Sequence, residues 1–486
     1  MSSQDPDKQN NQPAETGKPA EETPASDGQK AGHVARADNG SVPEAKAKAS
    51  PAHEPAPAVA PQPARVTEEA KKPVEMPSDP AGASNSSAPD SPDNEPAAES
   101  ESGTADPQDQ AVVVVPADPL RPVRIWLWLL AAMVFAMVVV GGATRLTEAG
   151  LSITEWKPLT GVIPPLSDAV WNETFNKYKQ IPQFKEMFST MTLAQYKVIY
   201  FWEWGHRLLG RLIGLVFVLP FLWFVYTRRI GWNLGWKLVL VLALGAIQGA
   251  IGWWMVKSGL AGRTEVAAER LAVHLLLASV TFVALIWLAM GLRGREPDEA
   301  RWDVRGEATG LIAVILIQIG LGALVAGARA GLTYNTWPLM DGHLVPSIGK
   351  LTSMKPFWLN FLENPTMLQF QHRMFAYLVV LMVLAHAYKT WQNRVGGRIA
   401  GRAWALSLLV LLQAALGVFT LLHVLPAGKM PIYLALAHQA VAFLLLGMAV
   451  VHRAAMARPG STGANRPAAA AGHKVQADTG DTAIAT

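Results

Sequence analysis

Long apolar runs alternate with polar loops through the middle of the chain. A helix needs about 20 apolar residues to cross a bilayer core, and only helices or closed barrels satisfy their backbone groups within lipid. Most runs lack the polar stripe of a soluble helical bundle. The pattern predicts an all-α polytopic membrane protein with eight transmembrane helices near 123–143, 198–227, 236–257, 268–291, 307–327, 366–388, 403–424 and 431–453.

The second half of this apolar region repeats the first. His206 and His372 follow similar residues and are 166 positions apart. Gln248 and Gln413 are 165 apart, and His274 and His438 are 164 apart. These near-equal offsets predict two pseudo-symmetric four-helix bundles related by an axis along the membrane normal, with an insertion of roughly 15 residues in the first long outer loop.

Composition separates two tails from the apolar region. Residues 1–118 are rich in Pro, Ala, Ser and acidic residues and hold almost no aromatic residue, and residues 457–486 are similar. Such segments bury too little apolar area to offset their chain entropy, so we expect both to be disordered. The N-terminal half then spans 119–295 and the C-terminal half 296–456. The polar stretch at Met1 does not resemble a cleavable signal peptide.

Charge orients the helices. Lys and Arg gather before the first run and after each even-numbered run. Because cytoplasmic loops carry the excess of positive charge, we expect both termini on the cytoplasmic side. The net charge of +4 then reflects topology rather than nucleic-acid binding. The chain has no cysteine, which excludes disulfides, iron–sulfur ligation and thiol catalysis by its own residues.

Seven of the eleven histidines lie within the predicted runs; His386, His423 and His452 are near helix ends, and four remain. His206, His274, His372 and His438 fall at a similar depth in even-numbered helices, nearer the outer face, and each half supplies one pair. A single intramembrane histidine could serve as an interhelical hydrogen bonder, but polar residues in the bilayer are costly and usually functional. Zinc normally takes three or four ligands. Two facing histidines suit the axial positions of a haem in a four-helix bundle.

The two halves differ beside their first histidine. Glu203 precedes His206 by three residues and shares its helical face, whereas the corresponding residue in the second half is Gln369. A carboxylate beside a haem edge can take a proton or stabilise positive charge, and an amide cannot. We therefore expect chemistry in the first half, with Glu203, His206 and His274 as its residues. The alternative is a carboxylate at headgroup level that pairs with Arg207.

In each half, one arginine directly follows the first histidine. Arg207 and Arg373 could bind carboxylates such as haem propionates. Equally, they could be interfacial anchors with extended side chains. Arg145 and Arg329, just outside the first and fifth helices, present the same two alternatives.

Several segments resemble the haem A synthase family, in its cysteine-free, alphaproteobacterial and mitochondrial-type branch. The resemblance covers about residues 121–455 and is specific, because several motifs match in order. They are GGATRLTEAGLSITEWKP from Gly141, EWGHRLLGR from Glu203, TYNTWPLMDG from Thr333 and QFQHRMFAY from Gln369. Some bacterial members of the family carry a cysteine pair in outer loops, so a mechanism that needs this pair does not apply to this chain.

The resemblance implies a membrane oxidoreductase of the bacterial inner membrane. It implies that His372 and His438 ligate a haem b and that His206 and His274 flank the substrate, haem O, with Glu203 as the acid beside it. The implied reaction is oxidation of the C8 methyl of haem O to a formyl group, which gives haem A for cytochrome c oxidase.

The resemblance also frames the partners of the chain. The chain shows no flavin or nicotinamide motif, so electrons must leave to an unidentified acceptor. Besides haem O and membrane lipid, the sequence leaves open haem O synthase, cytochrome oxidase assembly factors and a second copy of the chain as partners.

Two other function classes compete. A dihaem b-type electron carrier would place two ligands 13 or 14 residues apart on one helix. His372 and His386 are 14 apart, as are His438 and His452, but only in the second half. A transporter would fit parallel repeats but does not need four matched histidines, and Pro220 is the one clear break in the ligand helices.

Overall fold

The fold is taken from a computed structural model that describes residues 118–293, 297–424 and 430–457. The two predicted tails lie almost entirely outside these ranges. Within them, eight helices are long and apolar enough to cross a membrane, so the chain is a multi-pass membrane protein. They are α1 (Arg121–Leu146), α4 (Leu193–Tyr226), α5 (Trp232–Gly259), α6 (Ala268–Gly291), α7 (Trp302–Gly327), α10 (Pro365–Gln392), α11 (Gly397–Leu422) and α12 (Ile432–Ala454).

The eight predicted spans are confirmed, and most helices extend a few residues beyond the apolar runs. The added turns include polar caps. Thr192 and Gln195 form a reciprocal capping box at the start of α4, and the Asn364 side chain accepts hydrogen bonds from the first turn of α10. Capping satisfies amide groups that have no partner within the helix. The length of an apolar run therefore underestimates the length of the helix, because the polar residues at the helix ends are not counted.

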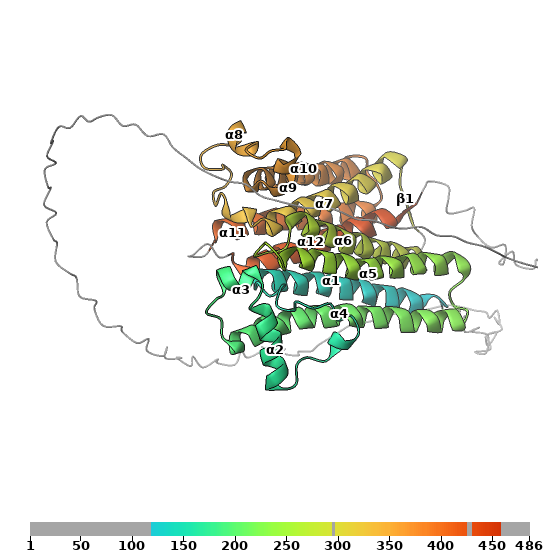
Figure 1. The fold of residues 1–486 in the computed structure, drawn as a ribbon. Coiled ribbons are helices and arrows are strands. Elements are labelled where there is room, and N and C mark those ends of the chain that lie inside the picture. The colour runs from blue at the N-terminus through green and yellow to red at the C-terminus, as the bar shows by residue number, and fades with distance from the viewer. Residues whose placement is uncertain (1–117, 294–296, 425–429, 458–486) are drawn as a thin grey trace, which may run out of the picture. The chain divides into compact units, whose positions relative to one another are not determined.

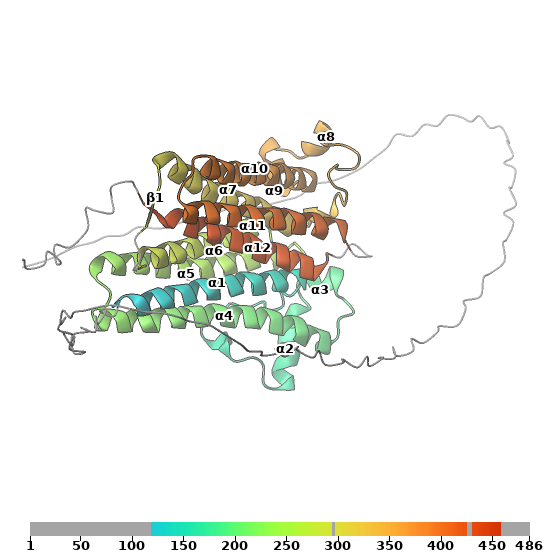
Figure 2. The same cartoon turned by 180° about the vertical axis from the view of Figure 1, so that it is seen from behind.

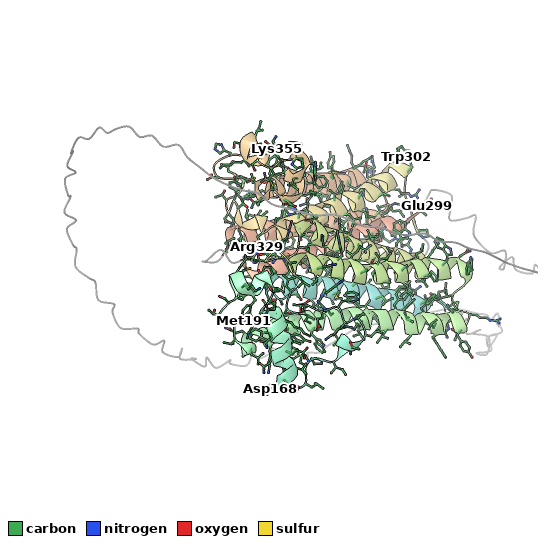
Figure 3. All side chains as sticks on the ribbon, in the orientation of Figure 1. Asp168, Met191, Glu299, Trp302, Arg329 and Lys355 are labelled. Atoms are coloured by element: carbon green, nitrogen blue, oxygen red, sulfur yellow. The ribbon has the colours of Figure 1, made fainter. Side chains whose placement is uncertain are left out.

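Short elements occupy the loops of the described chain, and one short strand directly follows α12. Figure 3 shows Met191, Arg329 and Lys355 toward one end of the long helices, with Glu299 and Trp302 toward the other. The sequence did not predict these elements. They are η1 (Thr160–Val162), α2 (Asp168–Tyr178), α3 (Pro182–Met187), η2 (Ala330–Leu332), α8 (Ile348–Leu351), η3 (Phe357–Leu359), α9 (Asn360–Glu363) and a two-stranded parallel pairing of β1 (Asp298–Glu299) with β2 (Met456–Ala457).

The first long loop carries α2 and α3, where the repeat predicted an insertion. Aromatic side chains dock this segment onto α4: Trp171 packs against Tyr200 at 4.9 Å between ring centroids, and Phe175 stacks on Tyr196 at 4.9 Å. The Tyr196 hydroxyl also donates to the Ser152 carbonyl at 3.0 Å. Buried aromatic pairs and a satisfied hydroxyl hold such a segment firmly.

Helix contacts follow the repeat. Helix α1 packs against α4 and α6, and α5 packs against α4 and α6; in the second half, α7 packs against α10 and α12, and α11 packs against α10 and α12. The halves meet through α6 with α7 and α12, and through α1 with α12 (Figures 1 and 2). Helices α1, α6, α7 and α12 therefore make the contact between the halves.

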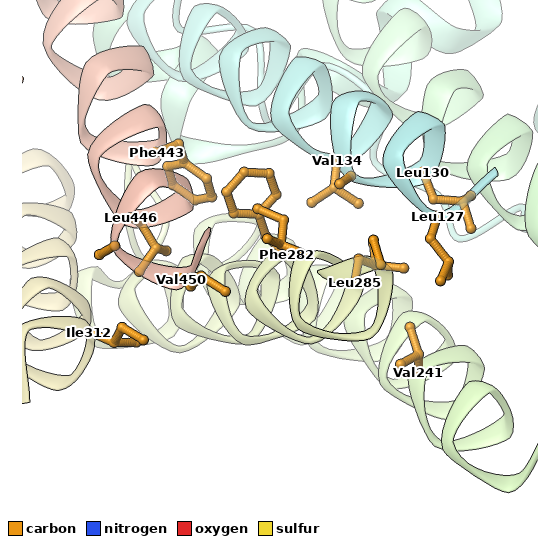
Figure 4. Packing of buried hydrophobic residues seen from close by; sticks show 14 of the residues in the cluster. Leu127, Leu130, Val134, Val241, Phe282, Leu285, Ile312, Phe443, Leu446 and Val450 are labelled. Atoms are coloured by element: carbon orange, nitrogen blue, oxygen red, sulfur yellow. The ribbon is translucent and has the colours of Figure 1, made fainter. Parts of the chain in front are cut away.

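A continuous apolar core runs through this contact. Phe282 on α6 and Phe443 on α12 lie 5.5 Å apart between ring centroids, and both are buried. Leu446 and Val450 extend the packing along α12, and Leu130 belongs to the same cluster on α1 (Figure 4). Between helices in lipid, close packing rather than exclusion of water supplies the attraction.

We predict that Phe443→Ala weakens the contact between the halves. The side chain is 1% exposed, and loss of a buried Phe typically costs about 3–5 kcal/mol. SDS-driven unfolding in detergent micelles would measure the change. The control is Leu408→Ala on α11, where the side chain is 71% exposed and we expect a change below about 0.5 kcal/mol. Equal effects of the two substitutions would contradict this packing.

Candidate functional site

One large cavity runs between the long helices. Its volume is about 1740 Å³, which exceeds the roughly 300–1,000 Å³ of a pocket for one small ligand. All four histidines singled out from the sequence line it, as do Glu203 and residues from both halves. The predicted site residues thus line one cavity, to which each half supplies its own pair of imidazoles.

Each of the four imidazoles faces a glycine on a neighbouring helix. A Cβ atom added at any of these glycines would lie within 3.1 Å of an imidazole atom, which is tighter than ordinary contact. Glycine therefore lets the edge of the ring approach the next helix closely. The pairs are His206 with Gly141, His274 with Gly252, His372 with Gly322 and His438 with Gly417.

Glutamine side chains hold two of these rings through Nδ1. The Gln248 amide nitrogen lies 3.1 Å from His274 Nδ1 and donates to the His274 carbonyl at 3.0 Å. The Gln318 amide repeats the arrangement on His372, at 3.1 Å to Nδ1 and 3.1 Å to the carbonyl. Such partners fix the orientation of an imidazole and select its tautomer.

The third glutamine contact differs in detail. His438 Nδ1 lies 3.1 Å from the backbone carbonyl of Gln413, while the Gln413 amide lies 3.3 Å from His438 Nε2. A ring that donates from Nδ1 to a carbonyl keeps a lone pair on Nε2, which is the form that binds a metal. No hydrogen bond to the ring of His206 is found among the described residues.

The three glutamines also fit a metal-bound state. The side-chain oxygens of Gln248, Gln318 and Gln413 are buried without a hydrogen-bond partner. When Nε2 of a neutral imidazole binds iron, Nδ1 carries the proton and needs an acceptor. A half-turn of the amide would offer that oxygen to Nδ1 of His274 and His372. The donor set therefore fits a porphyrin iron, and within the described ranges no three His, Cys, Asp or Glu side chains group around a metal position.

Glu203 is fully engaged by three donors. One carboxylate oxygen accepts from the Ser152 hydroxyl and the Ile153 amide, both at 2.7 Å, and the other accepts from the Arg207 guanidinium at 2.6 Å. The side chain is 3% exposed. Pairing with Arg207, which the sequence offered as the alternative, is present at a buried position. Both carboxylate oxygens therefore have partners within the protein.

The second half docks its corresponding loop without a carboxylate. The Gln369 amide donates to the Tyr334 carbonyl at 3.0 Å, and Arg373 donates to the carbonyls of Tyr334 and Thr336, each at 2.9 Å. Arg207 likewise donates to the Ile153 carbonyl at 2.9 Å. Both arginines line the cavity, but Arg207 has a carboxylate partner and Arg373 contacts only carbonyl oxygens in the described chain.

An ion-pair network joins the halves beside the C-terminal ends of α1 and α7. Arg329, which follows α7, pairs with Glu148, which follows α1, at 2.5 Å, and it also pairs with Glu265. Arg145 pairs with the same two carboxylates and donates to the Ala326 carbonyl at 3.2 Å. Burial raises the pKa of Glu148, and Arg145 and Arg329 oppose that change. These two arginines therefore have partners within the protein.

A second histidine pair lies toward the opposite end of the C-terminal half. His386 Nε2 and His452 Nε2 are 2.9 Å apart, and His386 Nδ1 lies 3.0 Å from Glu307. Two imidazoles on opposite sides of a metal, each at about 2 Å, would be about 4 Å apart. The hydrogen-bonded pair leaves no room for an iron, so the spacing of 14 residues does not indicate a second haem here.

Sequence reasoning missed Gln318 and treated Gln248 and Gln413 only as markers of the repeat. A signal was available, because a glutamine within an apolar span is costly unless it has a partner. Hydropathy does not show which partner that is. Only the packing of α5, α7 and α11 against the next helix pairs each glutamine with a histidine.

Known proteins match this chain over its membrane region. The family model described as Cytochrome oxidase assembly protein matches residues 124–450. A Heme A synthase of Rhodopseudomonas palustris (strain BisA53) is 50% identical over 355 residues, which are 73% of this chain and 96% of that protein. A Heme A synthase of Beijerinckia indica subsp. indica is 52% identical over 341 residues, 70% of this chain and 94% of that protein. The chain therefore belongs to the haem A synthase family of cytochrome oxidase assembly proteins.

Proposed function

We propose that this protein is a haem A synthase, which oxidises the C8 methyl of haem O to a formyl group and so supplies haem A for cytochrome c oxidase. The observation that carries the proposal is the pair of imidazoles that each half presents to one large cavity, His206 with His274 and His372 with His438. Relatives at about half identity that bear the name Heme A synthase add to it.

We assign haem b to His372 and His438. His438 donates from Nδ1 to a backbone carbonyl, which leaves a lone pair on Nε2, and His372 has Gln318 as its partner. When bound, haem b supplies one-electron redox chemistry. Arg373 lines the cavity and has no carboxylate among its described contacts, which suits a haem propionate.

We assign the substrate haem O to His206 and His274. Conversion of a methyl to a formyl group removes four electrons, and each electron that is removed before its proton leaves positive charge on the substrate. Glu203 lies three residues before His206 on α4 and lines the same cavity. Its carboxyl group, paired with Arg207, would stabilise positive charge that develops on the substrate. Gln369 cannot do so, which gives the two halves different tasks.

Arg207 has a positioning role in this assignment. It holds Glu203 and, through the carbonyls of Ile153 and Glu155, the loop that closes over the first half. Because Glu203 already neutralises Arg207, Arg373 is the better candidate to bind a haem propionate. The sequence had offered both arginines equally for that role.

We also propose an inner-membrane location with both termini cytoplasmic. Arg228 and Arg229 directly follow α4, Lys389 lies in the last turn of α10, and Arg398 lies in the first turn of α11. These positions are on the same side of the helices, which the positive-inside rule assigns to the cytoplasm. The electron acceptor and the docking of haem O synthase or assembly factors remain predictions from the sequence.

Haem extraction tests the two assignments. We expect His372→Ala or His438→Ala to lose haem b, because each removes one axial ligand. We expect His274→Ala to retain haem b but to form no haem A. Chromatography and mass determination of haems extracted from protein purified from a haem O-producing host would measure both. Loss of haem b from His274→Ala but not from His372→Ala would reverse the assignment of the halves.

A charge-only substitution tests Glu203. Glu203→Gln keeps the size of the side chain and reproduces the residue of the second half. We expect conversion of haem O to fall by roughly 10²–10⁴-fold if the carboxylate acts on the substrate, measured as haem A formed per haem b. Gln369→Glu is the matched control, and we expect it to leave conversion within a few-fold. Unchanged conversion in Glu203→Gln would reduce Glu203 to an anchor of the 152–153 loop.

A further inference from the structure

The four cavity histidines are not held alike. His274, His372 and His438 each contact a glutamine of the neighbouring helix through ring nitrogens. His206 has no such partner among the described residues. All four rings lie close to a glycine, but the nearest ring atom is Nε2 in His206 and Cε1 in the other three, so both the polar partner and the orientation of the ring set His206 apart.

The repeat shows which residue stands in place of the missing partner. Gly141 on α1 and Gly322 on α7 face the first histidine of their halves and are 181 positions apart. One helical turn earlier, Gln318 contacts His372, and the residue 181 positions before it is Met137. Met137 lines the cavity. The first half therefore carries a thioether where the second carries an amide.

An amide and a thioether affect an axial ligand differently. A hydrogen-bonded partner on Nδ1 orients the ring and raises the basicity of the nitrogen that binds the metal, and loss of such partners typically weakens metal binding about 10- to 100-fold. A thioether sulfur is a weak acceptor and has no N–H to donate. In the first half, His274 is thus a supported ligand and His206 an unsupported one.

We propose that Gln248, Gln318 and Gln413 are positioning residues for His274, His372 and His438, and that His206, opposite Met137, is the axial ligand that detaches from the iron of the substrate haem. This inference rests on the proposed function. Detachment of His206 opens a coordination position in the first half, while the second half stays six-coordinate and restricted to electron transfer.

The coordination position that His206 would leave open lies near Glu203, the other residue that differs between the halves. His206 and Glu203 lie on one face of α4, three residues apart, and both line the cavity. Detachment of His206 would therefore expose the iron on the side where the carboxylate lies. Detachment of His274 would expose the opposite side, where the nearby polar side chain is Gln248.

A reciprocal exchange tests the proposal. Met137→Gln installs the missing amide, and Gln318→Met removes its counterpart, with little change in side-chain volume. The probe is carbon monoxide added to the dithionite-reduced protein, with the bound fraction read from difference spectra and the spin state from resonance Raman spectra. We expect the unchanged protein to bind carbon monoxide at the first-half haem alone. Met137→Gln should lower that affinity about 10- to 100-fold, and Gln318→Met should make the second-half haem reactive.

The control is Met133→Gln, one turn earlier on α1 and outside the cavity lining; it should leave carbon monoxide binding unchanged. The Gln318→Met result needs only the resident haem b, so it does not depend on what fills the first half. Absence of haem at His372 and His438 would defeat the proposed function. Intact haem content with carbon monoxide binding unaltered by both exchanges would overturn this inference alone.

Discussion

An imidazole inside a membrane-spanning bundle has no water to satisfy its ring nitrogens, so each ring must bind a ligand or a neighbouring polar group. This constraint organises the centre of the protein. It explains why glycines stand opposite the four histidines, where each ring needs space beside a helix. It also explains why glutamines interrupt otherwise apolar spans, since amides can serve rings that must otherwise be buried unpaired.

Duplication of one scaffold lets two similar sites carry out different tasks. The outer loop is docked onto the second helix of each half by a residue three positions before the histidine, but Glu203 accepts hydrogen bonds there and Gln369 donates one. Both fulfil the docking. Only the carboxylate adds a negative charge beside the cavity. The exchange of Glu203 for Gln369 between the halves therefore keeps the docking of the loop but distinguishes the proposed substrate site from the proposed haem b site.

Coupling between the halves is apolar in the centre and ionic at the end where α1 and α7 finish. Phe282 and Phe443 pack where α6 meets α12, and Arg145, Arg329, Glu148 and Glu265 form a network above them. Arg329 and Glu148 are 181 positions apart, the offset that relates Gly150 to Gly331. Equivalent positions of the repeat thus carry opposite charges and pair with each other, which ties the two halves together beside their shared cavity.

The sequence by itself determined the eight spans, the repeat and the four histidines at matched depth, because apolar run length and residue offsets are properties of the chain alone. The insertion in the first outer loop also followed from the offsets. The structure decided which side chains meet: the glycine and glutamine beside each ring, the three donors on Glu203, the pairing of Arg145 and Arg329 with carboxylates, and the His386–His452 contact. These depend on how each helix is rotated about its axis. In a membrane protein, lipid-facing and core-facing side chains are equally apolar, so hydropathy does not encode that rotation.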